Sequence, residues 1–259
     1  MKFVTGNCGF IGRNLLAKLD GQVACYDTLT NTLPDIFTIL DAIEWENIEE
    51  IYHLGAISDT TCKDINLLHA HNVDFSIRLF EKAIDYQIPV TYASSGSVYG
   101  NTCENNQYRI NPLNYYAMTK ATVDAWVEDN MDRFKLVRGM RFFNVYGDNE
   151  GSKGEQASPY YKFMKQANET GVIKIFDNSD GTQRDFIHVN SVVKTILECK
   201  RESGIYDVGT AAPKSFTEVA ESVAKRTGAA IERIKFPPSL WGKYQYFTKA
   251  QYNYNELML

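Results

Sequence analysis

Three glycines spaced three residues apart stand near the start of the chain, in the segment Thr5-Gly6-Asn7-Cys8-Gly9-Phe10-Ile11-Gly12. A β-rich run precedes them at residues 2–5, and an amphipathic helical pattern follows at residues 10–19. In such a unit the first glycine permits a tight turn, the second lets the backbone approach a pyrophosphate, and the third lets the helix pack closely on the sheet. The helix N-terminus also offers its amide groups to the phosphates. The segment therefore predicts a dinucleotide-binding βαβ unit, and the alternative is a plain strand–turn–helix with incidental glycines.

The rest of the chain keeps alternating between strand-like and helix-like segments. We expect strands at residues 23–26, 51–54, 90–93, 135–142, 172–176, 186–189 and 205–208. We expect helices at residues 65–86, 115–133, 159–169 and 216–226, and a further regular element at 192–200. Such alternation favours a parallel sheet whose right-handed crossovers place helices on both faces. The predicted fold is therefore α/β, with a doubly wound parallel sheet of the Rossmann type.

The character of the sequence changes after Asn144, which suggests two domains. We expect residues 1–145, with a return at about 184–208, to form a NAD(P)-binding Rossmann domain. Residues 146–183 and 209–259 would then form a small α/β C-terminal substrate-binding cap. Residues 147–156 are polar and contain glycines, so we expect a functional loop there. The aromatic-rich last twenty residues are expected to pack as a structural cover or to wall a binding site.

Composition excludes several classes of protein. The 259 residues carry 27 basic and 32 acidic side chains, a net charge of −5 that offers no electrostatic footprint for nucleic acid. No run of about 18 apolar residues is present, so we expect no membrane span. The five cysteines are scattered and form no C-x-x-C pair, which argues against a disulfide framework or a zinc site. We expect no bound metal, a cytoplasmic location, and a buried, structural role for His53.

Asp27 follows the second expected strand, 15 residues after Gly12. A carboxylate there can accept hydrogen bonds from both ribose hydroxyls of NAD and would repel the 2′-phosphate of NADP. The next dozen residues contain no arginine or lysine, so the position favours NAD. The alternative is a turn cap beside Thr28 and Thr30.

Ser95, Tyr116 and Lys120 form the candidate catalytic set. A Tyr-x-x-x-Lys pair on a helix places both side chains on one face, where the ammonium can stabilise a tyrosinate and lower the phenol pKa. A serine at the end of the preceding strand can hold a substrate alcohol beside them. Tyr161 and Lys165 repeat the spacing, but only Tyr116 follows a serine-bearing strand end, so we favour Tyr116.

Four ordered motifs together resemble the extended short-chain dehydrogenase/reductase superfamily. They are the glycine segment, Tyr92-Ala93-Ser94-Ser95-Gly96-Ser97-Val98-Tyr99-Gly100, the Tyr116–Lys120 pair and Arg141-Phe142-Phe143-Asn144-Val145-Tyr146-Gly147. Within it, the chain is most similar to the ADP-glyceromanno-heptose 6-epimerases. That likeness lies in Gly55-Ala56-x-Ser58, Glu150-Gly151-x-Lys153-Gly154, Gln183-Arg184-Asp185-Phe186 and Phe236-Pro237-x-x-Leu240-x-Gly242-x-Tyr244. Glu155 and Lys162 stand where that family places a serine and a histidine.

The resemblance implies a nucleotide-sugar epimerase with one retained NAD(P) per subunit. It oxidises a sugar carbinol to a transient ketone and returns hydride to the other face. Tyr116, Lys120, Ser95 and Lys153 would be catalytic, with Lys153 as a second acid/base; the alternative for Lys153 is a solvated loop lysine. The resemblance implies cofactor contacts from Gly6, Gly9, Phe10, Ile11, Gly12, Asp27, Gly55, Ala56, Asn72, Lys120 and Val145. It implies substrate contacts from Ser58, Ser95, Asn144, Phe176, Arg184 and Tyr244.

Several alternatives stay open at this point. Arg184 could instead pair with Asp185 or Asp180. The protein could be another epimerase, such as one acting at C4 of a UDP-hexose, or a non-catalytic dinucleotide-sensing module. The apolar faces of residues 65–86 and 115–133 resemble helices through which these enzymes form homo-oligomers, and core packing explains the same pattern.

Overall fold

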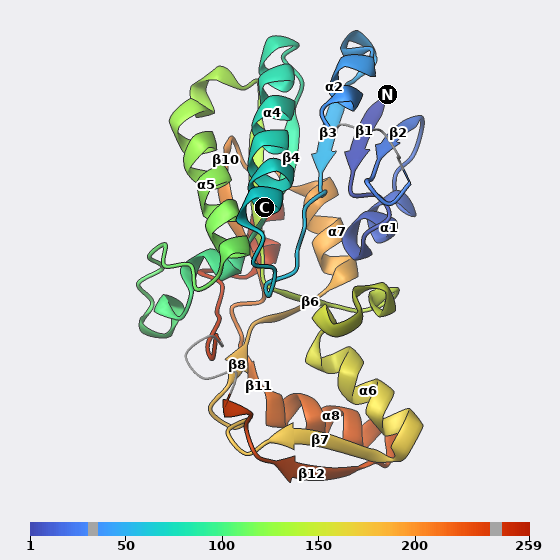
Figure 1. Cartoon of the computed structure of the whole chain (residues 1–259), viewed down its shortest axis with the longest axis vertical. Coiled ribbons are helices and arrows are strands. Elements are labelled where there is room, and N and C mark those ends of the chain that lie inside the picture. The colour runs from blue at the N-terminus through green and yellow to red at the C-terminus, as the bar shows by residue number, and fades with distance from the viewer. Residues whose placement is uncertain (31–35, 239–244) are drawn as a thin grey trace.

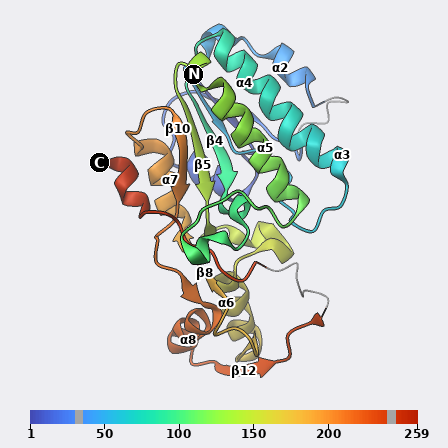
Figure 2. The same cartoon turned by 90° about the vertical axis from the view of Figure 1, so that its left-hand side faces the viewer.

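A six-stranded parallel sheet forms the centre of the protein. The computed structural model describes residues 1–30, 36–238 and 245–259. The strand order is β10-β5-β4-β3-β1-β2, and every neighbouring pair is parallel (Figure 1 and Figure 2). The bounds are β1 Lys2–Thr5, β2 Val23–Tyr26, β3 Glu50–His53, β4 Val90–Ser95, β5 Val137–Phe142 and β10 Gly204–Val208. The expected α/β fold with a doubly wound parallel sheet is confirmed.

Helices cover both faces of this sheet (Figure 2). One face packs against α2 (Thr38–Ala42), α4 (Phe75–Asp85) and α5 (Tyr115–Asn130), and the other against α1 (Phe10–Leu16) and α7 (Val189–Glu198). Successive strand residues point to opposite faces, so Phe3 joins the first core cluster and Val4 the second.

The strand order reverses beside β1, because β2 lies on one side of it and β3 on the other. Open α/β sheets bind ligands outside the carboxyl ends of their strands at such a switch point. Gly6 ends β1 there with φ +72°, and a Cβ on it would lie 2.5 Å from the Gly55 nitrogen after β3. The two strand ends therefore come together only because glycine leaves room.

A smaller lobe lies beyond the carboxyl edge of the sheet (Figure 1). It contains α6 (Pro159–Thr170), α8 (Phe216–Thr227) and the parallel pair β7 (Val172–Phe176) and β12 (Ala230–Ile234). Ser158 caps α6 and a Ser215–Glu218 capping box begins α8, while Gly171 and Gly228 end these helices in the left-handed conformation. Short pairs connect the lobe to the sheet: β6 (Asn144–Tyr146) with β9 (Phe186–His188), and β8 (Gln183–Arg184) with β11 (Lys214–Ser215).

Two expected segments differ in the structure. Residues 65–86 divide into α3 (Ile65–Leu68), a π-helical turn (His69–Asp74, labelled η2) and α4. The wider turn accompanies the inward placement of Asn72, which is fully buried and hydrogen-bonded to Ile57. The functional loop expected at 147–156 contains 3₁₀ turns at Glu150–Gln156 (η6), with a kink at Gly154.

The C-terminal residues return to the large lobe. Tyr252, Tyr254 and Leu257 pack against the core beneath α7, and the last short helix is η8 (Tyr254–Met258). The stretch 209–259, expected to belong to the cap, therefore divides between the two lobes. None of the helices within the described ranges is long and apolar enough to cross a membrane.

Candidate active site

A cavity of about 1110 Å³ lies between the carboxyl edge of the sheet and the small lobe. Its wall includes every candidate site residue in the described ranges except Asn72. Those residues are Gly6, Gly9, Phe10, Ile11, Gly12, Asp27, Gly55, Ala56, Ser58, Ser95, Tyr116, Lys120, Asn144, Val145, Lys153, Phe176 and Arg184. Tyr244 falls outside the described residues. The sequence candidates, drawn from distant parts of the chain, thus meet around one space.

The glycine loop has the shape that a dinucleotide needs. A Cβ on Gly12 would lie 2.1 Å from the Gly6 carbonyl oxygen, so only glycine allows helix α1 to begin so close to β1. The first turn of α1 faces the cavity, and its amides have no carbonyl acceptor within the helix. These amides can receive a pyrophosphate, so the residues present fit a dinucleotide.

Asp27 caps the turn that follows β2, as the alternative interpretation of this residue predicted. Its carboxylate accepts hydrogen bonds from the Cys8 and Leu29 backbone amides, both at 2.9 Å. The side chain therefore fixes the glycine loop and caps the turn after β2, while still lining the cavity.

Asn72 does not line the cavity, so the expectation of a direct cofactor contact is corrected. The amide is completely buried behind the wall, where its oxygen accepts from the Ile57 amide at 2.8 Å. Its nitrogen donates to the Ile57 carbonyl at 3.0 Å and to Thr119 at 3.1 Å. Asn72 thus holds the strand-end segment 55–58 against α5, which is a structural role.

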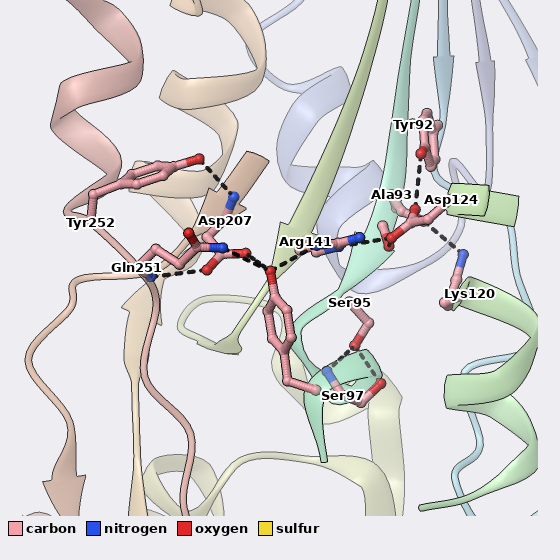
Figure 3. Close-up of polar contacts among 12 residues, drawn as sticks. Tyr92, Ala93, Ser95, Ser97, Lys120, Asp124, Arg141, Asp207, Gln251 and Tyr252 are labelled. Atoms are coloured by element: carbon pink, nitrogen blue, oxygen red, sulfur yellow. Dashed lines mark hydrogen bonds and ion pairs between the residues drawn. The ribbon is translucent and has the colours of Figure 1, made fainter. Parts of the chain in front are cut away.

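Tyr116 and Ser95 lie next to one another on the cavity wall. Ser97 donates a hydrogen bond of 2.8 Å to the Ser95 hydroxyl (Figure 3), and a hydrogen bond joins Ser95 to the Tyr116 phenol. Burial raises the pKa of Tyr116, the bond with Ser95 lowers it in part, and Asp124 raises it again. The sequence predicted a lowered phenol pKa. In this structure burial outweighs the serine, and the Lys120 ammonium is directed elsewhere.

Lys120 is buried and donates to the Ala93 carbonyl at 2.7 Å (Figure 3). Burial lowers the pKa of this ammonium to about 8, and the charge of Asp124 one helical turn further along opposes that effect. Lys120 therefore remains mostly charged at neutral pH. That charge also contributes to the low pKa of His53, which burial depresses to about 3.

Asp124 begins a buried polar network that crosses the sheet edge (Figure 3). The carboxylate accepts hydrogen bonds from Tyr92, Ser94 and Arg141, each within 2.9 Å. Arg141 also donates to the Tyr99 hydroxyl at 2.8 Å, and Tyr99 donates to Asp207 at 2.8 Å. The Asp207 carboxylate then accepts from the backbone of Gln251 in the C-terminal segment. Sequence analysis assigned no role to Asp124 because its partners come from distant parts of the chain.

Lys153 reaches the cavity from η6. Its ammonium lies 3.4 Å from the Glu150 carboxylate and 5.2 Å from the centre of the Phe10 ring. Burial lowers the pKa of Lys153, Glu150 raises it, and Lys162 lowers it. The side chain is about one quarter exposed, at 27%, so it is not the fully solvated loop lysine of the alternative interpretation.

The small lobe contributes a positively charged and aromatic wall. Arg184 lies over the Phe216 ring at 5.7 Å, and Phe176 packs edge-on against Phe236 at 5.2 Å. The alternative partners of Arg184 are engaged elsewhere: Asp185 accepts bonds from Thr210, Ala211 and Ala250, and Asp180 pairs with Arg233. The sequence missed Gln166 and Lys174, and it treated Lys162 only as a departure; all three line the cavity. The sequence could have indicated them only by position, because Lys162 and Gln166 lie on α6 and Lys174 lies on β7, the strand that also carries Phe176.

The competing sequence features lie outside the cavity wall. Neither Tyr161 nor Lys165 lines it, and Lys165 is exposed beside Glu169. His53 is buried between Thr5 at 2.6 Å and Ser76 at 2.8 Å, as its sequence context predicted. Within residues 1–30, 36–238 and 245–259, no group of three His, Cys, Asp or Glu could hold a metal ion.

Comparison with known proteins agrees with this geometry. The sequence model of the NAD-dependent epimerase/dehydratase family matches residues 3–209. The chain belongs to this family. A curated relative, the ADP-L-glycero-D-manno-heptose-6-epimerase of Alkalilimnicola ehrlichii, is 34% identical over 96% of this chain and 88% of its own length. The protein is accordingly an enzyme of the epimerase/dehydratase type, and the resemblance found in the sequence is confirmed.

Two solved structures share the fold. An ADP-L-glycero-D-manno-heptose-6-epimerase from Helicobacter pylori has a TM-score of 0.78 at 24% identity, over 99% of this chain and 94% of its own. A UDP-glucose 4-epimerase from Thermus thermophilus, in complex with NAD, has a TM-score of 0.79 at 23% identity, over 100% and 92%. The fold alone therefore does not distinguish a heptose from a hexose substrate.

Proposed function

We propose that this protein is a nucleotide-sugar epimerase that inverts C6 of an ADP-glycero-manno-heptose, a precursor for lipopolysaccharide. The observation that carries the proposal is the arrangement of Ser95, Tyr116, Lys120 and Lys153 around the cavity that the glycine loop enters. A proton can thus be handled by two separate groups beside one cofactor site. The 34% identity to a heptose epimerase supports the choice of sugar.

The cofactor would lie along the glycine loop. Gly6, Gly9, Phe10, Ile11 and Gly12 would receive the pyrophosphate, and Asp27 would accept the ribose hydroxyls, which favours NAD over NADP. Gly55, Ala56 and Val145 would line its course toward Lys120, with one cofactor retained in each subunit. When bound, the nicotinamide supplies reversible oxidation of the sugar carbinol to a ketone.

Tyr116 would take the hydroxyl proton of the sugar. Burial raises the phenol pKa and Ser95 lowers it in part, so the phenolate depends on Ser95. Lys120 would add its charge to that stabilisation by turning from the Ala93 carbonyl toward the phenol. Ser95 would also hold the reacting oxygen. Once the ketone intermediate has rotated within the site, its oxygen would face Lys153. As hydride returns to the carbonyl carbon, Lys153 would donate a proton to that oxygen.

The nucleotide part of the substrate would occupy the small-lobe wall. The guanidinium of Arg184 suits a diphosphate, and Phe176 offers an apolar face. Ser58, Asn144 and Tyr244 would contact the remaining polar groups. Lys162 and Lys174 line the same cavity and add positive charge for an anionic substrate.

The test begins with ADP-heptose and the purified protein. NMR should show equilibration of the two C6 epimers, and the protein should carry tightly bound nicotinamide. Tyr116→Phe should abolish epimerisation while cofactor remains bound, whereas Tyr161→Phe, the matched change outside the cavity, should retain activity. Full turnover by Tyr116→Phe would contradict the proposal.

A second candidate is a UDP-hexose 4-epimerase, favoured by the equally close fold of the Thermus enzyme. Turnover of a UDP-hexose with no change in ADP-heptose would select it. A non-catalytic dinucleotide sensor would bind cofactor and turn over neither substrate, although the Tyr116 and Lys120 pair argues against that role.

The organisation of the enzyme follows from the same proposal. Residues 1–145 and about 184–208 would bind the cofactor, and residues 146–183 and 209–259 the substrate, with the last ten residues bracing the cofactor lobe. Five free cysteines support a reducing compartment such as the cytoplasm.

We also propose a homo-oligomer. Apolar side chains of the neighbouring helices α3 and α5 remain exposed, namely Ile65, Leu67, Tyr115 and Met118. A second copy of the chain would cover them, and light scattering should then give a mass above that of one chain.

A further inference from the structure

Glu150 is a buried carboxylate at the start of η6, between the cavity wall and helix α6. Its side chain is 1% exposed. One carboxylate oxygen accepts from the Ser158 amide at 2.6 Å, and the other accepts from the Ser158 hydroxyl at 2.8 Å and the Gly147 amide at 3.4 Å. A buried charge requires such bonds, and here they join both ends of the turn that carries Lys153.

The cationic partner of this carboxylate is Lys153, whose ammonium lies 3.4 Å away. The ammonium lies over the Phe10 ring of α1, and Lys162 approaches it from α6 as a like charge. The exposed Arg13 of α1 lines the same cavity. Among the described residues, Glu150 is therefore a negative charge that offsets burial and repulsion at Lys153.

The backbone of this turn needs an anchor. Asn149 has φ +69° and Gly154 has φ +52°, so the chain reverses sharply on both sides of Lys153. The same Ser158 that donates twice to Glu150 caps α6, the helix that brings Lys162 and Gln166 to the cavity. Glu150 thus connects the Lys153 turn to the substrate-facing helix through two bonds to one residue.

We infer that Glu150 is the positioning residue for Lys153: it fixes the ammonium in the cavity, keeps it protonated and ties it to the N-terminus of α6. This inference rests on the proposed role of Lys153 as the second acid/base. Glu150 itself touches neither sugar nor cofactor and acts through Lys153.

The experiment is an NMR titration of the Lys153 side chain in the full-length protein, with the signal assigned by Lys153→Arg. Glu150→Gln should lower the apparent pKa of Lys153 by about one unit or more, because a carboxylate at this distance stabilises the ammonium. It should also reduce kcat by about tenfold or more, with a smaller change in KM. Ser158→Ala, which removes one bond but keeps the charge, should leave the Lys153 titration in place. An unshifted titration in Glu150→Gln, or an equal shift in Ser158→Ala, would overturn the inference.

A second variant covers the case in which Glu150→Gln does not fold. Lys153→Met leaves the buried Glu150 carboxylate without its cation, so its negative charge destabilises the folded state. Its stability deficit relative to the wild type should therefore grow as pH rises from 5 to 7. A constant deficit contradicts the pairing. Both readouts are independent of turnover, so an intact titration shift with no ADP-heptose epimerisation would refute the proposed function alone.

Discussion

Arg141 is the cation on which the buried network depends, and replacing it gives a quantitative test. Arg141→Leu leaves the Asp124 carboxylate, itself 2% exposed, without its hydrogen-bonded cation; the neutral hydroxyls of Tyr92 and Ser94 and the more distant Lys120 charge remain. Removing one partner of a buried ion pair costs about 3–5 kcal/mol, because the remaining charge stays buried without its direct counter-ion. The entropy of unfolding is about 0.5 kcal/mol/K for a chain of this length, so a loss of ~4 kcal/mol lowers Tm by about 7 °C.

The assay is urea and thermal unfolding of four proteins: the wild type, each single variant and the double variant Asp124→Asn/Arg141→Leu. Removing both charges should cost about 2 kcal/mol less than the two single losses combined. Arg138→Leu is the matched control on the same strand, where the guanidinium bonds an exposed carbonyl and should matter by less than about 1 kcal/mol. A loss below about 1 kcal/mol for Arg141→Leu, or strict additivity in the cycle, would refute the reasoning.

Three further perturbations follow from single contacts. Burial holds the pKa of His53 down from 6.5 to about 3, so the stability of its neutral form is present above pH 6.5 and is lost as pH falls toward 3. The wild type should therefore lose about 2 kcal/mol between pH 8 and pH 5 that His53→Gln does not lose, as measured by urea unfolding. Gly12→Ala places a Cβ against the Gly6 carbonyl and should abolish cofactor binding in calorimetry, whereas unchanged affinity would contradict the close packing of α1. One carboxylate oxygen of Asp185 accepts from Thr210 and the other from Ala250, and Asp185→Asn replaces one of these oxygens by an amide donor, so hydrogen exchange should speed up in residues 245–254; unaltered protection would show that this carboxylate does not anchor the segment.

Local patterns predicted the parts of this fold that local physics determines. The run at residues 2–5 matches β1 in extent, and the helices at Pro159 and Phe216 begin where predicted because Ser158 and Ser215 cap them. The glycine spacing correctly predicted two positions, Gly6 and Gly12, at which a Cβ atom would clash with neighbouring backbone. The Tyr116 and Lys120 spacing likewise places both side chains on the cavity wall.

Features created by long-range contacts could not be read in the same way. The Asn72 amide could contact a cofactor, but its hydrogen bonds to the Ile57 backbone give it a structural role instead. The direction of the Tyr116 pKa depends on burial, which no spacing encodes. Residues 147–156 carry no regular sequence pattern, because the contact that holds this segment is the side-chain pairing of Glu150 with Ser158.

The chain passes repeatedly between its two lobes, and this has a consequence for how such a protein can be altered. β6, β9, the stretch after β10 and residues 245–250 each cross the boundary, and the last crossing delivers Tyr252 and Leu257 to the large-lobe core. The small lobe therefore cannot be exchanged as a cassette between two cut sites, and a chain ended at residue 209, where the family match stops, would leave that core open to water. Insertions would be tolerated at Gly171 or Gly228, where the chain turns into β7 and β12 with open space around it, whereas a change in substrate preference has to come from the cavity-lining residues Lys174, Ile175 and Phe176.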